Sequence, residues 1–237
     1  LIWGVTDILH LAYAEFLMFA MYLVFFLYLL FQLDPLLSLP IAVVALFIAG
    51  VACYKLVISR VIDAPSYAQI FSTFGLLVFM RYIAFFLFTP TYRTIGESYL
   101  MGCAEFAGVR VGIPELGAFL GSITTTGLVF CFIKYTKIGK AIRATAQDKE
   151  AAIAVGISID RMYKLAWGIS SACLGVAGAL LATFFYIYPD VGGVFLLMGF
   201  VAVTLGGLGN IHGSFIGGLV IGMIQMLGSV YVSPGYE

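Results

Sequence analysis

The chain has 237 residues, of which 62% are hydrophobic and only 10% are charged, and its mean hydropathy is +1.09. A water-soluble domain carries about 45–50% apolar and about 25% charged residues, so a soluble enzyme, a disordered tail and a secreted disulfide scaffold are excluded. The 12 basic and 12 acidic residues balance, and no basic stripe for nucleic acid exists. The composition predicts a polytopic membrane protein that forms one transmembrane domain over residues 1–237.

Charge-free apolar runs predict where the chain crosses the bilayer, because a crossing helix needs about 20 such residues. No run shows sustained alternation with a period of two, which argues against strands and for an all-α protein. The last run, Val191–Tyr236, is too long for one helix. Its glycine-rich middle, Gly206–Gly213, divides it into two crossings or a re-entrant pair, of which Val194–Gly209 is the shortest segment. About seven transmembrane segments are therefore expected, and the first five are Phe16–Leu33, Leu36–Tyr54, Pro65–Phe88, Leu116–Ile133 and Leu165–Tyr188.

Basic residues are concentrated in two connections, 55–64 and 134–164, which lie on one side if the segments between them each cross once. Cytoplasmic loops carry an excess of Lys and Arg, so this side is predicted to be cytoplasmic and the protein to be a multi-pass protein of the cell membrane. The longest connection on the outer side, 89–115, is expected to fold as a cap or docking surface. The same side carries most of the acidic residues outside the helices: Asp34, Glu97, Glu105, Glu115, Asp190 and Glu237.

Ionisable residues inside the membrane are the first candidates for function. Asp7, His10, Tyr13 and Glu15 cluster where a first helical stretch meets the next one. They form either a proton relay or a cap and hinge at a helix break. Arg81 lies within a predicted crossing, where it either snorkels to the headgroups or lines a pathway.

The glycine-rich middle of the last run contains Asn210, which is the only Asn in the chain, and His212. These two residues are either a polar lining at an interrupted segment, as in transporters, or ordinary turn chemistry. Small residues at four-residue spacing, such as Gly209–Gly213–Gly217 and Gly175–Ala179, predict close helix packing.

Signatures of catalysis are absent from the sequence, which has no HExxH, GxSxG or GxxxxGK[ST] motif. Its two His and four Cys are too few and too separated for a metal site. We therefore expect no enzyme activity, no metal and no cofactor. If ATP drives transport here, another chain must bind it.

The cytoplasmic connection 134–164 is predicted to contain a short capped helix. Asp148 is expected to cap a short helix over Lys149–Val155, and Gly156 to end it with positive φ. Such a helix is marginal alone in water. Its small apolar face, formed by Ala151, Ala152 and Val155, favours docking into a groove on another protein. The alternative is an amphipathic segment that rests on the headgroups.

Glu150-Ala151-Ala152, followed after three residues by Gly156, resembles the EAAxxxG core of the coupling loop in ABC importer permeases. Gly139–Arg161 and Leu205–Gly222 resemble the branched-chain amino acid permease family, although that family often has Pro in place of His212. Leu9–Glu15 resembles its early Asn-Phe-Ala-His-Gly-Glu segment, with His10 and Tyr13 substituted. The family normally has a helix before Gly4 and another after Tyr236, so we expect a chain trimmed at both ends.

The resemblance implies a bundle like that of ABC importer permeases, and a membrane subunit that imports branched-chain or related amino acids. The implied partners are cytoplasmic ATP-binding subunits, a second permease subunit, an external substrate-binding protein and the lipid bilayer. Coupling to the ATPase is then expected at Arg143, Asp148, Glu150, Ala151, Ala152, Gly156 and Arg161. A translocation pathway is expected at His10, Tyr13, Glu15, Asn210 and His212. Alternatives are an importer of urea, amides or simple sugars, a proton-coupled carrier that uses Glu15, His10 and Arg81, and an intramembrane enzyme.

Overall fold

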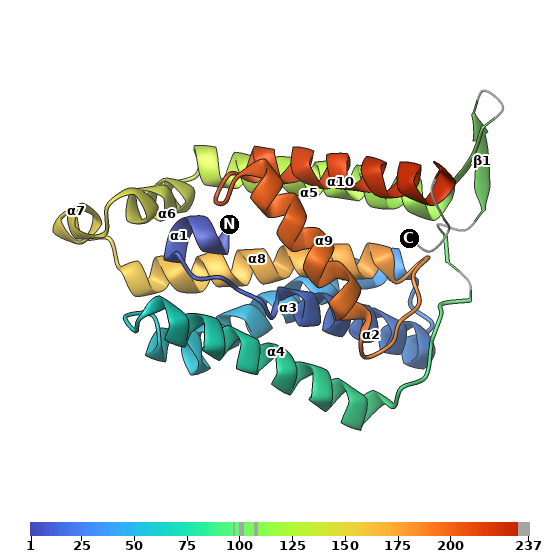
Figure 1. The fold of residues 1–237 in the computed structure, drawn as a ribbon, viewed down its shortest axis with the longest axis horizontal. Helices are drawn as coiled ribbons and strands as arrows, with labels where there is room; N and C mark the ends of the chain where they lie inside the picture. Colours follow the sequence, from blue (N-terminus) through green and yellow to red (C-terminus); the bar gives the residue numbers. More distant parts are fainter. Residues whose placement is uncertain (97, 100–101, 107–108, 232–237) are drawn as a thin grey trace.

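The computed structural model describes residues 1–96, 98–99, 102–106 and 109–231. Over these residues the chain is a bundle of helices with one small β-hairpin at an end (Figure 1). The elements in chain order are α1 (Ile2–Thr6), α2 (Tyr13–Phe31), α3 (Pro35–Leu56), the 3-10 turn η1 (Ile58–Arg60), α4 (Ser66–Phe88), β1 (Cys103–Phe106), β2 (Val109–Gly112), α5 (Ile113–Tyr135), α6 (Lys137–Gln147), α7 (Lys149–Ala154), α8 (Ile159–Leu181), α9 (Val191–Gly206) and α10 (Ile211–Tyr231).

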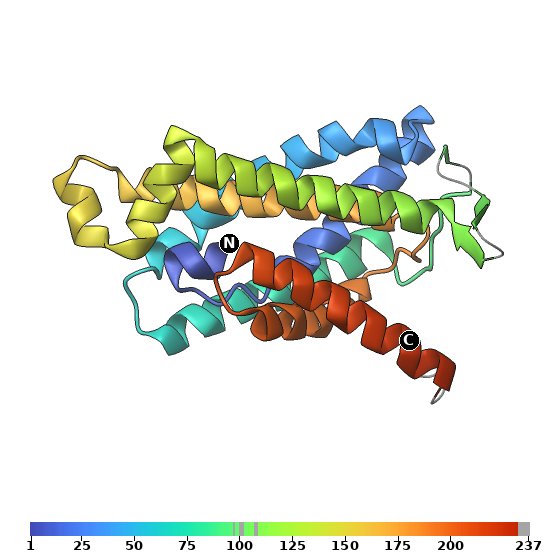
Figure 2. The same cartoon turned by 90° about the horizontal axis from the view of Figure 1, so that it is seen from above.

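Six of the described helices are long and apolar enough to cross a membrane, and α9 is shorter, with 16 residues. At 1.5 Å per residue, α9 extends about 24 Å, which is less than the roughly 30 Å of a hydrocarbon core. The predicted segments correspond to α2, α3, α4, α5, α8, α9 and α10, so the prediction of an all-α polytopic membrane protein is confirmed. In both views α9 runs away from the hairpin end and α10 returns toward it (Figures 1 and 2).

The fifth predicted segment is displaced, because α8 spans Ile159–Leu181 rather than Leu165–Tyr188. Charged residues form its first turns, where Lys164 and Asp160 make an ion pair of 2.5 Å four residues apart, so a search for charge-free runs begins the helix too late. At its other end the chain leaves the helix at Ala182. Ile187 then exchanges two backbone hydrogen bonds with Arg93, of 2.8 and 3.0 Å.

The centre of the bundle is α8, which packs along α3 and α2 through small residues. A Cβ on Gly50 of α3 would collide with Ser171 of α8, and a Cβ on Gly175 would lie 2.8 Å from the carbonyl oxygen of Ala42. Without a hydrophobic effect between helices in lipid, such close approach is what holds them together. The predicted close packing at Gly175 is therefore present.

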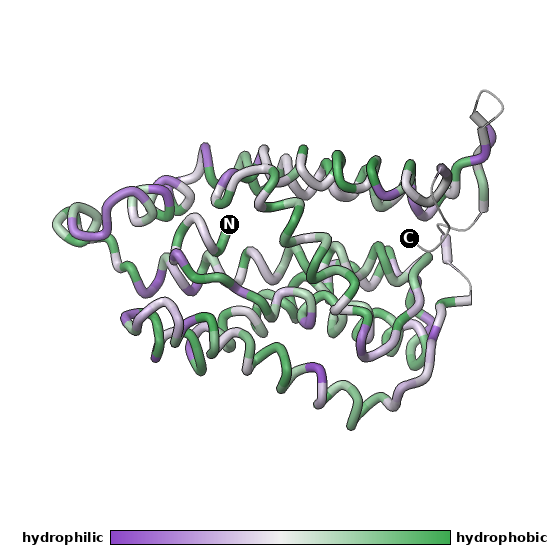
Figure 3. The backbone as a smooth tube through the Cα atoms, viewed as in Figure 1, coloured by the Kyte–Doolittle hydropathy of each residue, from purple (hydrophilic) through white to green (hydrophobic). Residues whose placement is uncertain are grey.

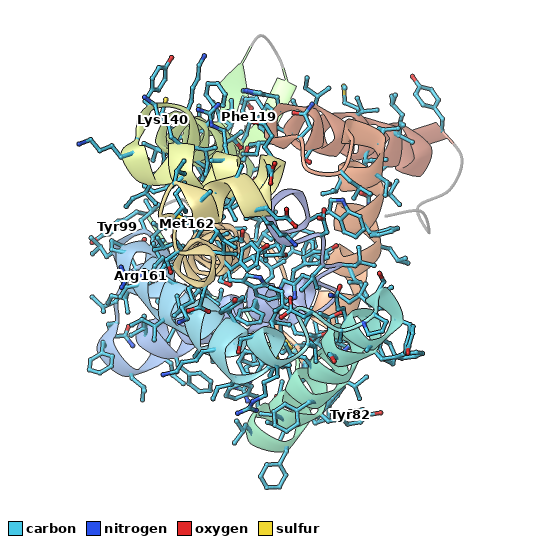
Figure 4. The ribbon with its side chains drawn as sticks, turned by 90° about the vertical axis from the view of Figure 1, so that its left-hand side faces the viewer. Tyr82, Tyr99, Phe119, Lys140, Arg161 and Met162 are labelled. Carbon is cyan, nitrogen blue, oxygen red and sulfur yellow. The ribbon has the colours of Figure 1, made fainter. Side chains whose placement is uncertain are left out.

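Polar residues gather at the two ends of the bundle and apolar residues fill its middle (Figure 3). The connection through η1 and the connection through α6 and α7 lie at the same end, opposite the hairpin (Figure 1). Figure 4 looks onto this end and shows Lys140 on α6 and Arg161 at the start of α8. The sequence therefore predicted correctly that the two basic connections share a side.

The predicted outer connection 89–115 is folded where the structure describes it. Strands β1 and β2 pair antiparallel, and Arg110 forms an exposed ion pair of 2.8 Å with Glu105, its cross-strand partner. Asp34 Oδ2 accepts a 2.6 Å hydrogen bond from the backbone N–H of Tyr99, which attaches the connection to the start of α3. Glu97 and Glu237, both predicted on this side, lie outside the described residues.

Candidate functional site

A break in the first helical stretch positions the polar cluster that the sequence predicted. Helix α1 ends at Thr6, Asp7 adopts a left-handed conformation with φ of 55°, and α2 begins only at Tyr13. Unwound backbone at membrane depth is tolerated where protein surrounds it. Here Thr73 of α4 donates a 2.8 Å hydrogen bond to the carbonyl oxygen of Leu9. The helix therefore does not continue from Asp7 to Glu15, which shows the break that the cap-and-hinge alternative requires.

Glu15 lies in the first turn of α2 and is fully buried, with 0% of its side chain exposed. Arg81 of α4 donates two hydrogen bonds to Glu15 Oε1, of 2.9 Å from Nε and 2.6 Å from Nη2. A buried carboxylate is strongly destabilising unless it is paired, so Arg81 is the group that makes this site possible.

A third residue completes this network from α9. Arg81 Nη1 lies 2.8 Å from Asp190 Oδ1, and Asp190 immediately precedes the first residue of α9. The side chain of Arg81 is 23% exposed, so it does not simply snorkel to the headgroups. It ties α4 to α2 and to the start of α9.

Tyr13 is a second tie between α2 and α9. Its hydroxyl donates to the carbonyl oxygens of Leu196, at 2.5 Å, and Phe195, at 3.1 Å. The ring lies over Gly199, where an added Cβ would fall 2.5 Å from the hydroxyl oxygen. The break therefore meets α9 directly at Tyr13 and, at Glu15, through Arg81 and Asp190.

His10 is also buried, with 8% of the residue exposed. Its ring packs against Trp167 of α8, with centroids 4.4 Å apart, and against the edge of Phe16 at 5.6 Å. Neither ring nitrogen has a hydrogen-bond partner among the described residues. The structure thus brings His10, Tyr13 and Glu15 together around one break.

Asn210 and His212 lie apart from that cluster, Asn210 in the turn between α9 and α10 and His212 in the first turn of α10. Asn210 Oδ1 accepts a 3.1 Å hydrogen bond from the N–H of Gly213 and caps α10. Gly207 and Gly209 have φ of 89° and 87°, so turn chemistry accounts for this segment. The ring of His212 contacts Phe130 of α5 edge-on at 4.2 Å.

The turn and the basic connection share a cavity of about 560 Å³, lined by Arg143, Asn210 and His212 among other residues. Arg143 is the one member of the predicted coupling set that reaches this cavity, from α6. It therefore joins two regions of the predicted site that are far apart in the sequence.

The predicted capped helix is present as α7. Asp148 Oδ1 accepts a 3.0 Å hydrogen bond from the N–H of Ala151, and Gly156 follows the helix with φ of 83°. Glu150 lies in its first turn, and Arg161 lies beyond it in the first turns of α8. The helix projects from the basic end of the bundle (Figure 1).

The exposed face of α7 keeps Ala151 and Val155 of the predicted face but not Ala152. Ala152 is only 2% exposed and packs inward, whereas Ile153 and Val155 are 62% and 75% exposed. The apolar surface available to a partner is therefore formed by these two larger side chains, with Ala151 exposed beside them. Ala152 instead fixes α7 to its own chain.

Three residues near the site were missed by sequence reasoning. Asp190 pairs with Arg81, and Trp167 packs against the ring of His10. Ser170 has a buried hydroxyl oxygen without a hydrogen-bond partner among the described residues. Asp190 had a signal, since it follows Pro189 and directly precedes an apolar run. The two α8 residues had none beyond being polar or aromatic within a crossing.

Comparisons with known proteins agree on one family. The model of the family described as branched-chain amino acid transport system / permease component matches residues 1–236. LivH of Salmonella typhimurium, a high-affinity branched-chain amino acid transport system permease protein, is 33% identical over 140 residues, which cover 59% of this chain and 46% of LivH. No solved structure matches the chain.

Two further relatives carry similar descriptions. LivH of Escherichia coli K12 is 41% identical over 107 residues, covering 45% of this chain and 35% of LivH. BraD of Pseudomonas aeruginosa is 24% identical over 250 residues, covering 100% of this chain and 81% of BraD. The chain thus matches less than half the length of the two LivH relatives.

Proposed function

The chain belongs to the family of branched-chain amino acid transport permeases, and from that premise we propose that it is the membrane-spanning subunit of an ATP-driven importer. Its cargo is branched-chain or related amino acids. The observation that carries the proposal is α7, a capped and projecting helix at the basic end of the bundle. The proposal gives this chain no covalent chemistry, so ATP hydrolysis belongs to partner subunits.

Coupling follows from the position of α7 between the partner ATPase subunits and α8 of this chain. ATP-driven closure of the partner subunits presses on Ile153 and Val155, the exposed apolar side chains. Ala152 is buried and the backbone N–H of Ile157 donates a 2.9 Å hydrogen bond to its carbonyl oxygen, so the push passes into α8. Because α8 packs on α3 and α2, a displacement biases the bundle between two states.

The remaining partners follow from the two ends of the bundle. ATP-binding subunits dock on α7, at the end of the bundle that is the cytoplasmic side because of its excess of Lys and Arg. An external substrate-binding protein docks on the hairpin end. A second permease subunit completes the pathway, and the whole assembly lies in the cell membrane.

The first test substitutes the exposed face of α7 while leaving its fold intact. We expect Ile153→Asp to reduce ATP-dependent leucine uptake in proteoliposomes at least tenfold, because a charge replaces an apolar contact with the ATPase. Ile138→Asp on α6, where Ile138 is 43% exposed, is the matched control and should retain uptake. Both variants should insert into the membrane normally.

The outcome separates the importer from its rivals. Uptake by Ile153→Asp equal to that of Ile138→Asp would remove α7 as the coupling element. Uptake that needs no ATPase and collapses with a protonophore would instead identify a proton-coupled carrier. A preference for urea or a sugar over leucine would keep the architecture and change the cargo.

A further inference from the structure

A cavity of about 230 Å³ lies beside the helix break, between residues 7–12, α8 and α9. Leu174 of α8 and Phe200 and Val203 of α9 provide apolar walls, and His10 and Ser170 provide polar ones. No Asp, Glu, Lys or Arg lines it among the described residues. The Glu15–Arg81 pair lies outside this lining, so the cavity is polar in places but uncharged.

Two polar side chains of this cavity have no partner in the part of the chain that the structure describes. Both ring nitrogens of His10 and the hydroxyl oxygen of Ser170 are buried without a hydrogen bond. A neutral histidine carries one donor and one acceptor, and a serine hydroxyl is both. Buried polar groups are almost always paired, so an unpaired set that lines one cavity calls for an explanation.

We propose that this cavity, the His10 cavity, binds one small solute that is polar at one end and aliphatic at the other, such as an amino acid with an aliphatic side chain. The inference rests on the proposed importer function and adds a location for its substrate. On binding, the buried His10 ring and Ser170 hydroxyl turn toward the solute and hydrogen bond its polar end. Leu174, Phe200 and Val203 contact the aliphatic end.

Size and charge limit what the His10 cavity accepts. Its volume of about 230 Å³ is many times what one water molecule needs, which leaves room for a small amino acid. The two α-charges of an aliphatic amino acid cancel, whereas a lysine or glutamate side chain adds a net charge that no lining residue neutralises, and an unpaired buried charge is very unfavourable. Helix α2 begins three residues after His10, and the positive end of its dipole favours a carboxylate there.

The test compares two valines of α9 that differ only in what they face. Val203 lines the cavity, whereas Val201 does not and is 43% exposed. Val203→Phe therefore fills the cavity, and Val201→Phe is its matched control. Val203→Ala enlarges the cavity and guards against a folding defect in the Phe variant.

Binding can be read without transport, because both tryptophans of the chain report on the cavity. Trp3 lines it and Trp167 contacts His10, and the chain has only these 2. The transporter without its substrate-binding protein, and with the tryptophans of its partner subunits replaced by phenylalanine, is titrated in nanodiscs with L-leucine, L-alanine and L-lysine to millimolar concentrations. Tryptophan emission and retention of tritiated leucine are measured together.

We expect saturable leucine binding in the wild type and in Val201→Phe, and no response to lysine. Val203→Phe should bind leucine at least tenfold more weakly and lose less affinity for alanine, while Val203→Ala keeps leucine binding. His10→Ala should weaken leucine and alanine by a similar factor of about ten, because it removes a partner of the shared polar end.

Two results would overturn the proposal: equal leucine binding by Val203→Phe and Val201→Phe, or no saturable response of the wild type to any of the three amino acids. Parallel uptake assays separate this failure from that of the importer. If ATP-driven leucine uptake is unchanged in Val203→Phe, the importer function stands and the His10 cavity is not its substrate site. Leucine binding that depends on Val203, without ATP-driven uptake, would leave the cavity and remove the importer.

Discussion

Two breaks between described helices, residues 7–12 and residues 207–210, are built in opposite ways. The first break, residues 7–12, is made of bulky residues with Ile8, His10 and Ala12 buried among other helices. The second break, residues 207–210, is glycine-rich and exposed. It is satisfied by its own backbone and by the Asn210 cap.

The difference shows where each break gets its stability. The first break depends on residues far away in the sequence, since Thr73, Arg81 and Asp190 hold it or its neighbour Glu15 in place. The second break would form from local turn chemistry alone. A break held by distant helices moves when those helices move, so it is the better place for a substrate site.

The second break also touches α1, the helix that leads into the first break. A Cβ on Gly4 of α1 would lie 2.9 Å from the Cα of Gly209. Only glycine at both positions permits this approach. The contact carries a displacement of the α9–α10 turn directly to α1 and so to the first break.

The largest effect is expected from removing Arg81, which holds Glu15 beside the first break from α4. Arg81→Ala leaves Glu15 buried without a partner, and we expect the free energy of unfolding to fall by about 3–5 kcal/mol. The measurement is the unfolding midpoint in mixed micelles with increasing SDS. The double variant Glu15→Gln/Arg81→Gln removes both charges and should recover most of the loss.

The hairpin provides the control for Arg81→Ala. Arg110→Ala breaks the exposed ion pair with Glu105, whose side chains are 78% and 66% exposed, and exposed pairs contribute little. If Arg81→Ala unfolds at the same SDS fraction as Arg110→Ala, the buried network does not support the first break.

A smaller effect is expected where α1 meets the second break. Gly209→Ala adds a Cβ that would lie 3.2 Å from the Cα of Gly4, at a residue whose φ is 87°. Strain of this kind costs about 1–3 kcal/mol. Gly218→Ala on α10 is the matched control, since an added Cβ there meets nothing within 4 Å. In a helix this change should stabilise by up to about 1 kcal/mol.

The decisive observation is the direction in which each glycine variant shifts the SDS unfolding midpoint. Opposite shifts would confirm that Gly209 is required by its conformation and its close neighbour. A stabilising effect of Gly209→Ala would mean that α1 is free to move away from the turn.

Features set by short-range chemistry were predictable from the sequence. The Asp148 cap and the positive φ of Gly156 follow from residue types a few positions apart, and so does the glycine turn. The pairing of Arg81 with Glu15 joins residues 66 positions apart, which no local pattern encodes. Likewise, the charged start of α8 and the inward position of Ala152 depend on packing that only the fold determines.

The smallest effect tests whether the second break is as local as its hydrogen bonds indicate. Asn210→Ala removes the side-chain acceptor of the Gly213 N–H, and loss of a helix cap costs about 1 kcal/mol. Asn210→Ser should restore most of it, because serine caps nearly as well. Hydrogen exchange at Gly213 should accelerate in the Ala variant alone, while leucine still quenches or enhances tryptophan emission as in the wild type. A change in that emission response would mean that the cap supports the His10 cavity across the Gly4–Gly209 contact, and that the second break is not independent of the first.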